Sequence, residues 1–432
     1  MKYCVNCGVA QPDEALFCTH CGNKFPTVPE GSVPEKPVVE KPAVPEVPPV
    51  EPPVKPRVKP REETFVREKS SSGKTEQPEK PERPEQPEKP DQPGQTGQKE
   101  QDDSFLNRVY DYLGSDKDVK IDWRVLFSDV LKEHTSEEAE RIFICGTSTT
   151  TPDPSEVSTN FPRPWLYGRI FLLLAATFAS LWFCSAALGN LNTLPGTMVV
   201  GSFIVPLSTV MLFFEINVWR NISFYNVLKT FMIGGCASVV ATLILFNLVS
   251  VEELDYVGAF LVGLVEEVGK AVIVFSYIRR LKHPTILNGL LYGACVGAGF
   301  AAFESAGYAF TGLMSSGFDG MIQSIFLRGF LAPGGHVAWA AVSGAAIVLA
   351  TKQMKRVTLS TTATNPVFLR LFVLPVAMHA LWDCPLASAI LPEIFGFHIG
   401  LIVCVWFILL VLINMGLKEI PSVSRKLNKP CI

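Results

Sequence analysis

Ionisable side chains occur in parts of this chain that are otherwise apolar enough to cross a membrane. A carboxylate at the centre of a bilayer costs at least ~2.5 kcal/mol, so such groups usually face the interior of a helix bundle and mark a functional site. They come from four separate apolar segments, so we expect them to meet in one site. Carboxylates and imidazoles together can transfer protons and activate water, which predicts hydrolysis inside the membrane. The candidate catalytic residues are Glu266, Glu267, Glu304, His336, His379 and Asp383.

The spacing of these residues adds local predictions. His379 and Asp383 are four residues apart, so a helix would place them on one face. One of them could bind a metal or a substrate oxygen while the other orients it. Glu266 and Lys270 have the same spacing, so Glu266 could pair with Lys270 while Glu267 points elsewhere. Either glutamate could be the general base, and the sequence does not choose between them.

The composition divides the chain into two very different halves. Residues 26–103 are almost entirely Pro, Glu, Lys, Gln and Val, whereas residues 165–417 are mainly Leu, Val, Ala, Phe, Gly and Ile. The first half cannot bury a core, so we expect an extended, disordered linker. The formal net charge of −3 gives no reason to expect nucleic acid as a partner.

Four cysteines near the N-terminus have the spacing of a structural zinc site. Two Cys-x2-Cys pairs separated by ten residues suit tetrahedral coordination by four thiolates. We therefore predict a zinc ribbon over residues 1–25, which would fold on the metal because it has too little core of its own. Thiolate ligands favour a reducing compartment, so this module would lie in the cytoplasm, where it could bind a protein partner. The predicted ligands are Cys4, Cys7, Cys18 and Cys21.

Residues 104–160 are predicted to form a small cytoplasmic segment of amphipathic helices. Thr135 and Glu138 form a capping box that would begin a helix running to Ile144. After it, residues 161–420 are predicted to form a polytopic, all-α membrane domain, and residues 421–432 a cytoplasmic tail.

The membrane domain contains eight apolar segments, each near the ~20 residues that span a bilayer. Basic loops alternate with acidic or neutral ones along the chain. We expect the protein to lie in the plasma membrane. The positive-inside rule then places both of its termini in the cytoplasm. The predicted spans are residues 165–187, 196–217, 230–250, 256–278, 285–310, 334–351, 366–386 and 396–416.

Four short motifs in this order resemble the PrsW family of intramembrane proteases. They are EEVGK from Glu266, FESAGY from Phe303, the lone His336, and HALWD from His379. The resemblance implies cleavage of membrane-embedded substrates, with anti-sigma factors the best-known class, and matches Glu266 and Glu267 to the glutamates that activate water. It places His336 and His379 around a zinc ion or the oxyanion, and Asp383 at the end of an HxxxN/D element. The second element, with Glu304, departs from the FxxxH of the distantly similar CAAX-processing proteases.

Other functions fit parts of the same pattern. The buried acids and histidines could bind an ion or peptide in a non-catalytic sensor or receptor. They could also form the proton relay of a secondary transporter. The signatures of other intramembrane proteases, HExxH, GxGD and GxSG, do not occur.

Overall fold

The computed structural model describes the backbone at 2–3 and 10–11, and residues 107–115, 123–352, 354, 356–385 and 396–427. Strand β1 (Lys2–Tyr3) pairs antiparallel with β2 (Ala10–Gln11), with Lys2 opposite Gln11. The predicted zinc ligands and the predicted linker lie outside the described residues.

The capping box that the sequence predicts before the first membrane helix is present. Helix α2 (Ser136–Phe143) begins with the capping box. The Glu138 N–H donates to Thr135 Oγ1, and the Thr135 N–H donates to Glu138 Oε2 at 2.9 Å. This backbone hydrogen bond holds the pKa of Glu138 below its ordinary value. The 3-10 helix η1 (Trp123–Phe127) precedes it, and the Tyr167 hydroxyl ties that turn to α3 through the Leu126 carbonyl at 3.0 Å.

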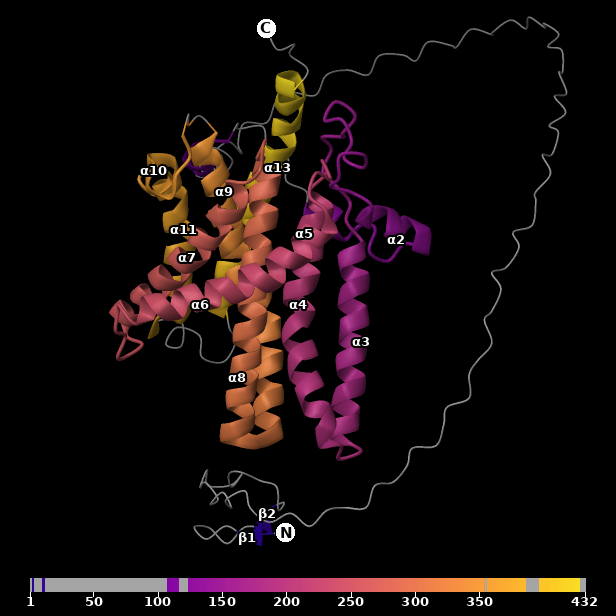
Figure 1. The fold of residues 1–432 in the computed structure, drawn as a ribbon, viewed down its shortest axis with the longest axis vertical. Helices are drawn as coiled ribbons and strands as arrows, with labels where there is room; N and C mark the ends of the chain where they lie inside the picture. The colour runs from indigo at the N-terminus through magenta and orange to yellow at the C-terminus, as the bar shows by residue number, and fades with distance from the viewer. Residues whose placement is uncertain are drawn as a thin grey trace, which may run out of the picture. The chain divides into compact units, whose positions relative to one another are not determined.

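The rest of the described chain is a bundle of long apolar helices (Figure 1). Short turns and one π-helical turn, η3, connect or extend them. The elements are α3 (Leu166–Ala186), η2 (Leu191–Thr193), α4 (Leu194–Ile216), α5 (Phe224–Lys229), η3 (Thr230–Gly234), α6 (Gly235–Phe246), α7 (Tyr256–Ile278), α8 (Ile286–Leu331), η4 (Ala332–Gly334), α9 (His336–Thr351), α10 (Leu359–Ala363), α11 (Pro366–Asp383) and α13 (Gly396–Leu427).

The protein is an all-α, multi-pass membrane protein. Among the described residues, 6 helices are long and apolar enough to cross a membrane. One of them, Ile286–Thr351, has 66 residues and would be about 100 Å long if it were straight, far more than one crossing. Helix α7 has 23 residues and is long enough to cross a membrane, but it is not among these 6 helices because its middle holds three charged side chains. The longest run contains two of the predicted segments, 285–310 and 334–351. When α7 is added, the described helices account for all eight predicted segments.

The predicted end of the fifth segment at residue 310 is wrong. Helix α8 continues to Gly317, where the backbone leaves the helical region with φ 71° and the chain folds back on itself. Gly312 and Gly320 then lie side by side across the turn, where a Cβ on either one would meet the other's carbonyl. The segment around Asp319, which lies between the predicted spans 285–310 and 334–351, is therefore the start of a returning helical arm, seen as the paired orange helices of Figure 1. A glycine turn inside an apolar run gives no change of composition that the sequence could reveal.

Glycine allows the first arm of α8 to approach α9 closely. A Cβ at Gly293 would overlap the Ala340 carbonyl, and one at Gly297 would overlap the His336 carbonyl. Such small-residue contacts let helix backbones pack tightly within a membrane. His336, the first residue of α9, is thereby held against the middle of α8.

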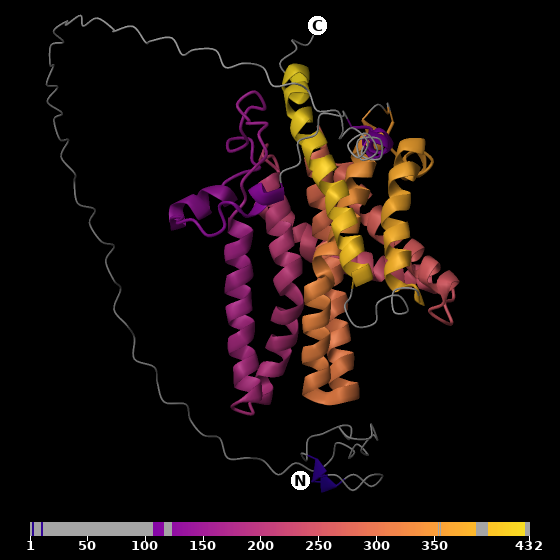
Figure 2. The same ribbon diagram turned by 180° about the vertical axis from the view of Figure 1, so that it is seen from behind.

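Three further helices complete the frame. Helix α11 packs on α7 where Gly263 lies against Val376 and Ala380. Helix α6 crosses α8 where Gly235 meets Gly299. Helix α13, yellow in Figure 2, lies against the start of α8. There Glu419 of α13 accepts the Ile286 N–H at 2.9 Å and pairs with Lys352 at 3.0 Å.

We expect Gly293→Ala to lower the free energy of unfolding by about 1–3 kcal/mol, because the added methyl overpacks the α8–α9 contact. The measurement is thermal unfolding of the detergent-solubilised protein. The matched control is Gly307→Ala in the same helix, where a Cβ would meet nothing within 4 Å. That variant should be neutral or stabilising by up to about 1 kcal/mol. Equal effects at the two positions would contradict the packing described.

Candidate active site

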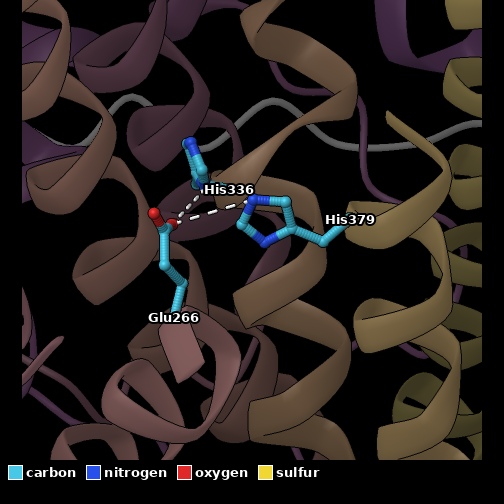
Figure 3. Close-up of side chains that lie close together, drawn as sticks. All are labelled: Glu266, His336 and His379. Atoms are coloured by element: carbon cyan, nitrogen blue, oxygen red, sulfur yellow. Dashed lines mark ion pairs between the residues drawn. The ribbon is translucent and has the colours of Figure 1, made fainter. Parts of the chain in front are cut away.

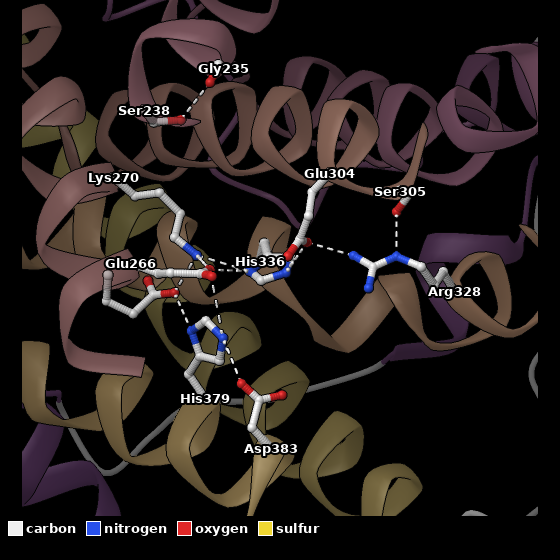
Figure 4. A network of polar contacts seen from close by, with 11 residues as sticks. Gly235, Ser238, Glu266, Lys270, Glu304, Ser305, Arg328, His336, His379 and Asp383 are labelled. Atoms are coloured by element: carbon white, nitrogen blue, oxygen red, sulfur yellow. Dashed lines mark hydrogen bonds and ion pairs between the residues drawn. The ribbon is translucent and has the colours of Figure 1, made fainter. Parts of the chain in front are cut away.

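The bundle brings all six predicted site residues into one cluster (Figure 4). Helix α7 supplies the two glutamates from its middle, and the first arm of α8 supplies Glu304. Helix α9 begins at His336, and the end of α11 supplies His379 and Asp383. The i, i+4 pair predicted on one helix face is present, because His379 Nε2 lies 3.3 Å from Asp383 Oδ2.

Glu266 and the two histidines form the centre of the cluster (Figure 3). Glu266 Oε2 lies 3.8 Å from His336 Nδ1 and 3.7 Å from His379 Nε2. One ligand atom from each of the three residues lies within 4.8 Å of the others. This group could hold a metal ion, and two imidazoles with one carboxylate are a donor set that suits catalytic zinc.

The second nitrogen of each imidazole is held by a carboxylate. His379 Nδ1 lies 3.0 Å from Glu267 Oε1, and His336 Nε2 lies 3.0 Å from Glu304 Oε2. A carboxylate accepts hydrogen bonds, so these hydrogen bonds assign a proton to each of those nitrogens. The opposite nitrogen of His336, Nδ1, then turns its lone pair toward the neighbouring Lys270 Nζ at 2.9 Å. The opposite nitrogen of His379, Nε2, faces two more carboxylates, Asp383 at 3.3 Å and Glu266 at 3.7 Å. Outer carboxylates that orient histidines in this way are the usual partners of metal-ligating imidazoles.

The buried Glu266 and Glu267 carboxylates need a cation beside them. Lys270 provides one, since its Nζ lies 2.7 Å from Glu267 Oε1, 3.3 Å from Glu266 Oε2 and 2.9 Å from His336 Nδ1. The predicted pair of Glu266 and Lys270 is therefore present, but Glu267 does not point elsewhere, because it contacts Lys270 as well. Positions three and four before a lysine both lie within reach of its long side chain on a helix, so both carboxylates contact it.

A second cation was not predicted as part of the site. Arg328 lies on the returning arm of α8, and its Nη2 is 2.5 Å from Glu304 Oε2. Its Nε donates to Ser305 Oγ at 2.9 Å, and its guanidinium lies 4.3 Å from the centre of the Tyr308 ring. Sequence reasoning missed this residue because the turn at Gly317, which brings position 328 beside position 304, carries no sequence signal.

An aromatic wall closes one side of the cluster. The Trp339 ring stacks on His379 with centroids 4.4 Å apart, and Trp382 packs edge-on against Trp339. Glu267 Oε2 and Trp339 Nε1 are buried and make no hydrogen bond to the described residues. Other parts of the cluster are more open, since the side chains of Glu304, Arg328 and Asp383 are 23%, 26% and 25% exposed. Reactants would therefore approach past these three residues.

The charges of the cluster leave room for one divalent cation. Four carboxylates, Glu266, Glu267, Glu304 and Asp383, face two fixed cations, Lys270 and Arg328. An imidazole that binds a metal is neutral, and with both histidines in that form the cluster carries two net negative charges in a largely buried place. An uncompensated buried charge is costly, so the residues present fit one bound divalent ion.

Comparison with known proteins places this cluster within a matched region. Residues 223–413, which contain all six site residues, match a family described as PrsW family intramembrane metalloprotease. Protease PrsW of Clostridioides difficile (strain 630) is 36% identical over 93 residues, which are 20% of this chain and 39% of that protein. The chain thus spans well under two thirds of the length of this curated relative. No solved structure matches the chain.

We expect Arg328→Gln to lower the free energy of unfolding by about 1–3 kcal/mol, because it leaves the Glu304 carboxylate without its cation in a largely buried position. The partial exposure of the pair keeps the loss below that of a fully buried pair. Thermal unfolding would be compared with that of Arg141→Gln. The Arg141–Glu137 pair has side chains 70% and 73% exposed, and should contribute less than about 0.5 kcal/mol. Equal losses would show that Arg328 does not stabilise the cluster.

Proposed function

Because residues 223–413 of this chain match the PrsW family of intramembrane metalloproteases, we propose that the protein is an intramembrane endopeptidase. It would hydrolyse peptide bonds in proteins embedded in the lipid bilayer. The observation that carries the proposal is the convergence of a glutamate pair, two histidines and an aspartate from α7, α9 and α11 on one partly open cluster within apolar helices.

Glu266, His336 and His379 would hold a catalytic zinc ion. The ion would supply Lewis-acid activation of water and of the substrate carbonyl. Support for this comes from the ligand atoms of these three residues, which lie within 4.8 Å of one another, and from the two net negative charges that the cluster carries when both imidazoles are neutral. Glu267 and Glu304 would fix the orientation and protonation of the two imidazoles from behind.

The remaining carboxylate is suited to proton transfer. Asp383 is 25% exposed in a more open part of the cluster, and the ion pair it makes within the described chain is with His379. It would take the proton of the attacking water and pass it to the leaving amine. Glu267 is fully buried, with one oxygen bound to Lys270 and His379. A role for Glu267 as the base that meets substrate water is therefore not supported, although the glutamate pair as a whole remains essential to the site.

The substrate class and the placement in the cell follow from the resemblance and the sequence. Substrates would be membrane proteins, including regulators of the anti-sigma-factor kind. The protein would lie in the plasma membrane with both termini in the cytoplasm, where the basic loops are expected. The N-terminal zinc ribbon, with Cys4, Cys7, Cys18 and Cys21 as ligands, would recruit a cytoplasmic protein.

We expect Glu266→Gln and His379→Ala each to reduce cleavage of a co-expressed, tagged membrane substrate by at least about a hundredfold, the scale of a lost catalytic group. The control is Glu252→Gln, in the exposed α6–α7 loop, which should cleave at the wild-type rate. Membrane levels of each variant would be measured on the same blot. Undiminished cleavage by both site variants would exclude this assignment, and a sensor or a transporter would then be the better interpretation.

Metal content provides an independent test. The purified full-length chain should contain about two zinc ions, one in the ribbon and one in the cluster. The variant His336→Ala/His379→Ala should contain about one, and so should Cys4→Ser/Cys7→Ser. The measurement is elemental analysis after gel filtration. Loss of zinc in the cysteine variant alone would show that the cluster works without a metal.

A further inference from the structure

We infer that Lys270 is a built-in cation that competes with the metal ion for two of its three ligand atoms. Its ammonium would hold Glu266 and His336 in place when no ion is bound, and would move aside when one binds. The inference rests on the ion site of the proposed function. It goes beyond that function in two ways. Lys270 would lower the affinity of the site for the metal ion, and it would hold the ligand residues in place when no ion is bound.

The contacts of Lys270 overlap those expected of the ion. Two of the three candidate ligand atoms, Glu266 Oε2 and His336 Nδ1, lie 3.3 Å and 2.9 Å from Lys270 Nζ. The His336 tautomer is the same for both partners, because Nε2 keeps its proton on Glu304 and Nδ1 offers its lone pair. A divalent ion bound to that lone pair would lie close to the ammonium. Like charges repel strongly where water is excluded.

Burial keeps the ammonium within the cluster. The Lys270 side chain is 0% exposed, so it cannot exchange its partners for water when an ion arrives. It has a place to move to, since Glu267 Oε1 at 2.7 Å is its nearest partner and is not one of the candidate ligand atoms. The Phe300 ring, 4.3 Å from Nζ, offers a further cation–π contact beside it. Lys270 can therefore withdraw toward Glu267 while it stays paired.

The same argument explains why the cluster would hold one ion. Glu266, Glu267 and His336 surround Lys270 Nζ with the atoms that a second metal would need. The Lys270 ammonium, which carries one positive charge, lies where that second metal ion would bind. Removal of Lys270 should therefore tighten zinc binding and make the fold depend more on zinc.

The test is zinc titration of the full-length chain in detergent, with Cys4→Ser and Cys7→Ser in every sample so that the predicted ribbon does not contribute. Free Zn²⁺ is buffered with a competing chelator. Lys270→Met should bind zinc at least about tenfold more tightly than the background chain, because a unit positive charge is removed beside the ligands. Its thermal unfolding midpoint should also rise more on addition of zinc. Lys352→Met, which breaks the Lys352–Glu419 pair far from the ligand atoms, is the matched control and should leave the zinc affinity unchanged.

A second pair of variants keeps the test decisive if Lys270→Met does not fold without zinc. Glu267→Gln/Lys270→Met removes one charge of each sign and leaves the net charge of the cluster as it was. It is compared with Glu267→Gln alone, and tighter zinc binding by the double variant supports the competition. Equal or weaker binding by both lysine variants overturns the inference about Lys270 and leaves the protease assignment intact. Absence of zinc binding in every sample overturns the ion site itself, whereas the cleavage test above decides the function separately.

Discussion

The energetic cost of charge inside an apolar bundle governs this structure. Every ionised group that α7, α8, α9 and α11 carry into the interior needs a partner of opposite charge or a hydrogen bond, because lipid and packed side chains offer neither. The partners are found within the same cluster, where Lys270 and Arg328 pair with the carboxylates and the carboxylates hold the imidazoles. The cluster is therefore a connected network in which most members have two or more partners.

Close helix packing makes that network geometrically possible. Glycines on the first arm of α8 bring its backbone against α9 and place His336 beside the middle of α8. Gly263 does the same for α7 and α11, so that Glu267 can reach His379 across the interface. Larger residues at these positions would meet the backbone of the neighbouring helix and push the helices apart. The glycines thus contribute to the proposed chemistry without touching a reactant.

The cluster combines a closed side with more open parts, and this arrangement suits hydrolysis within a membrane. Trp339 and Trp382 exclude water behind the histidines, which strengthens electrostatic interactions there. Glu304, Arg328 and Asp383 remain partly exposed, so water and a peptide bond can approach the same atoms. The role proposed for Lys270 also explains how the ligand residues would keep their arrangement when no metal ion is bound.

The sequence by itself determined the class of the protein, the apolar helices and the residues of the cluster. Hydropathy and charge are local properties, so α3, α7 and α9 begin and end within two residues of the predicted segments. The capping box of α2 is equally local, because all of its partners lie within four residues. Tertiary structure alone decided that α8 turns back at Gly317, that Arg328 joins Glu304, and that Lys270 contacts His336. These contacts depend on how distant helices cross, and crossing is set by the sum of many small packing contacts that no short stretch of sequence encodes.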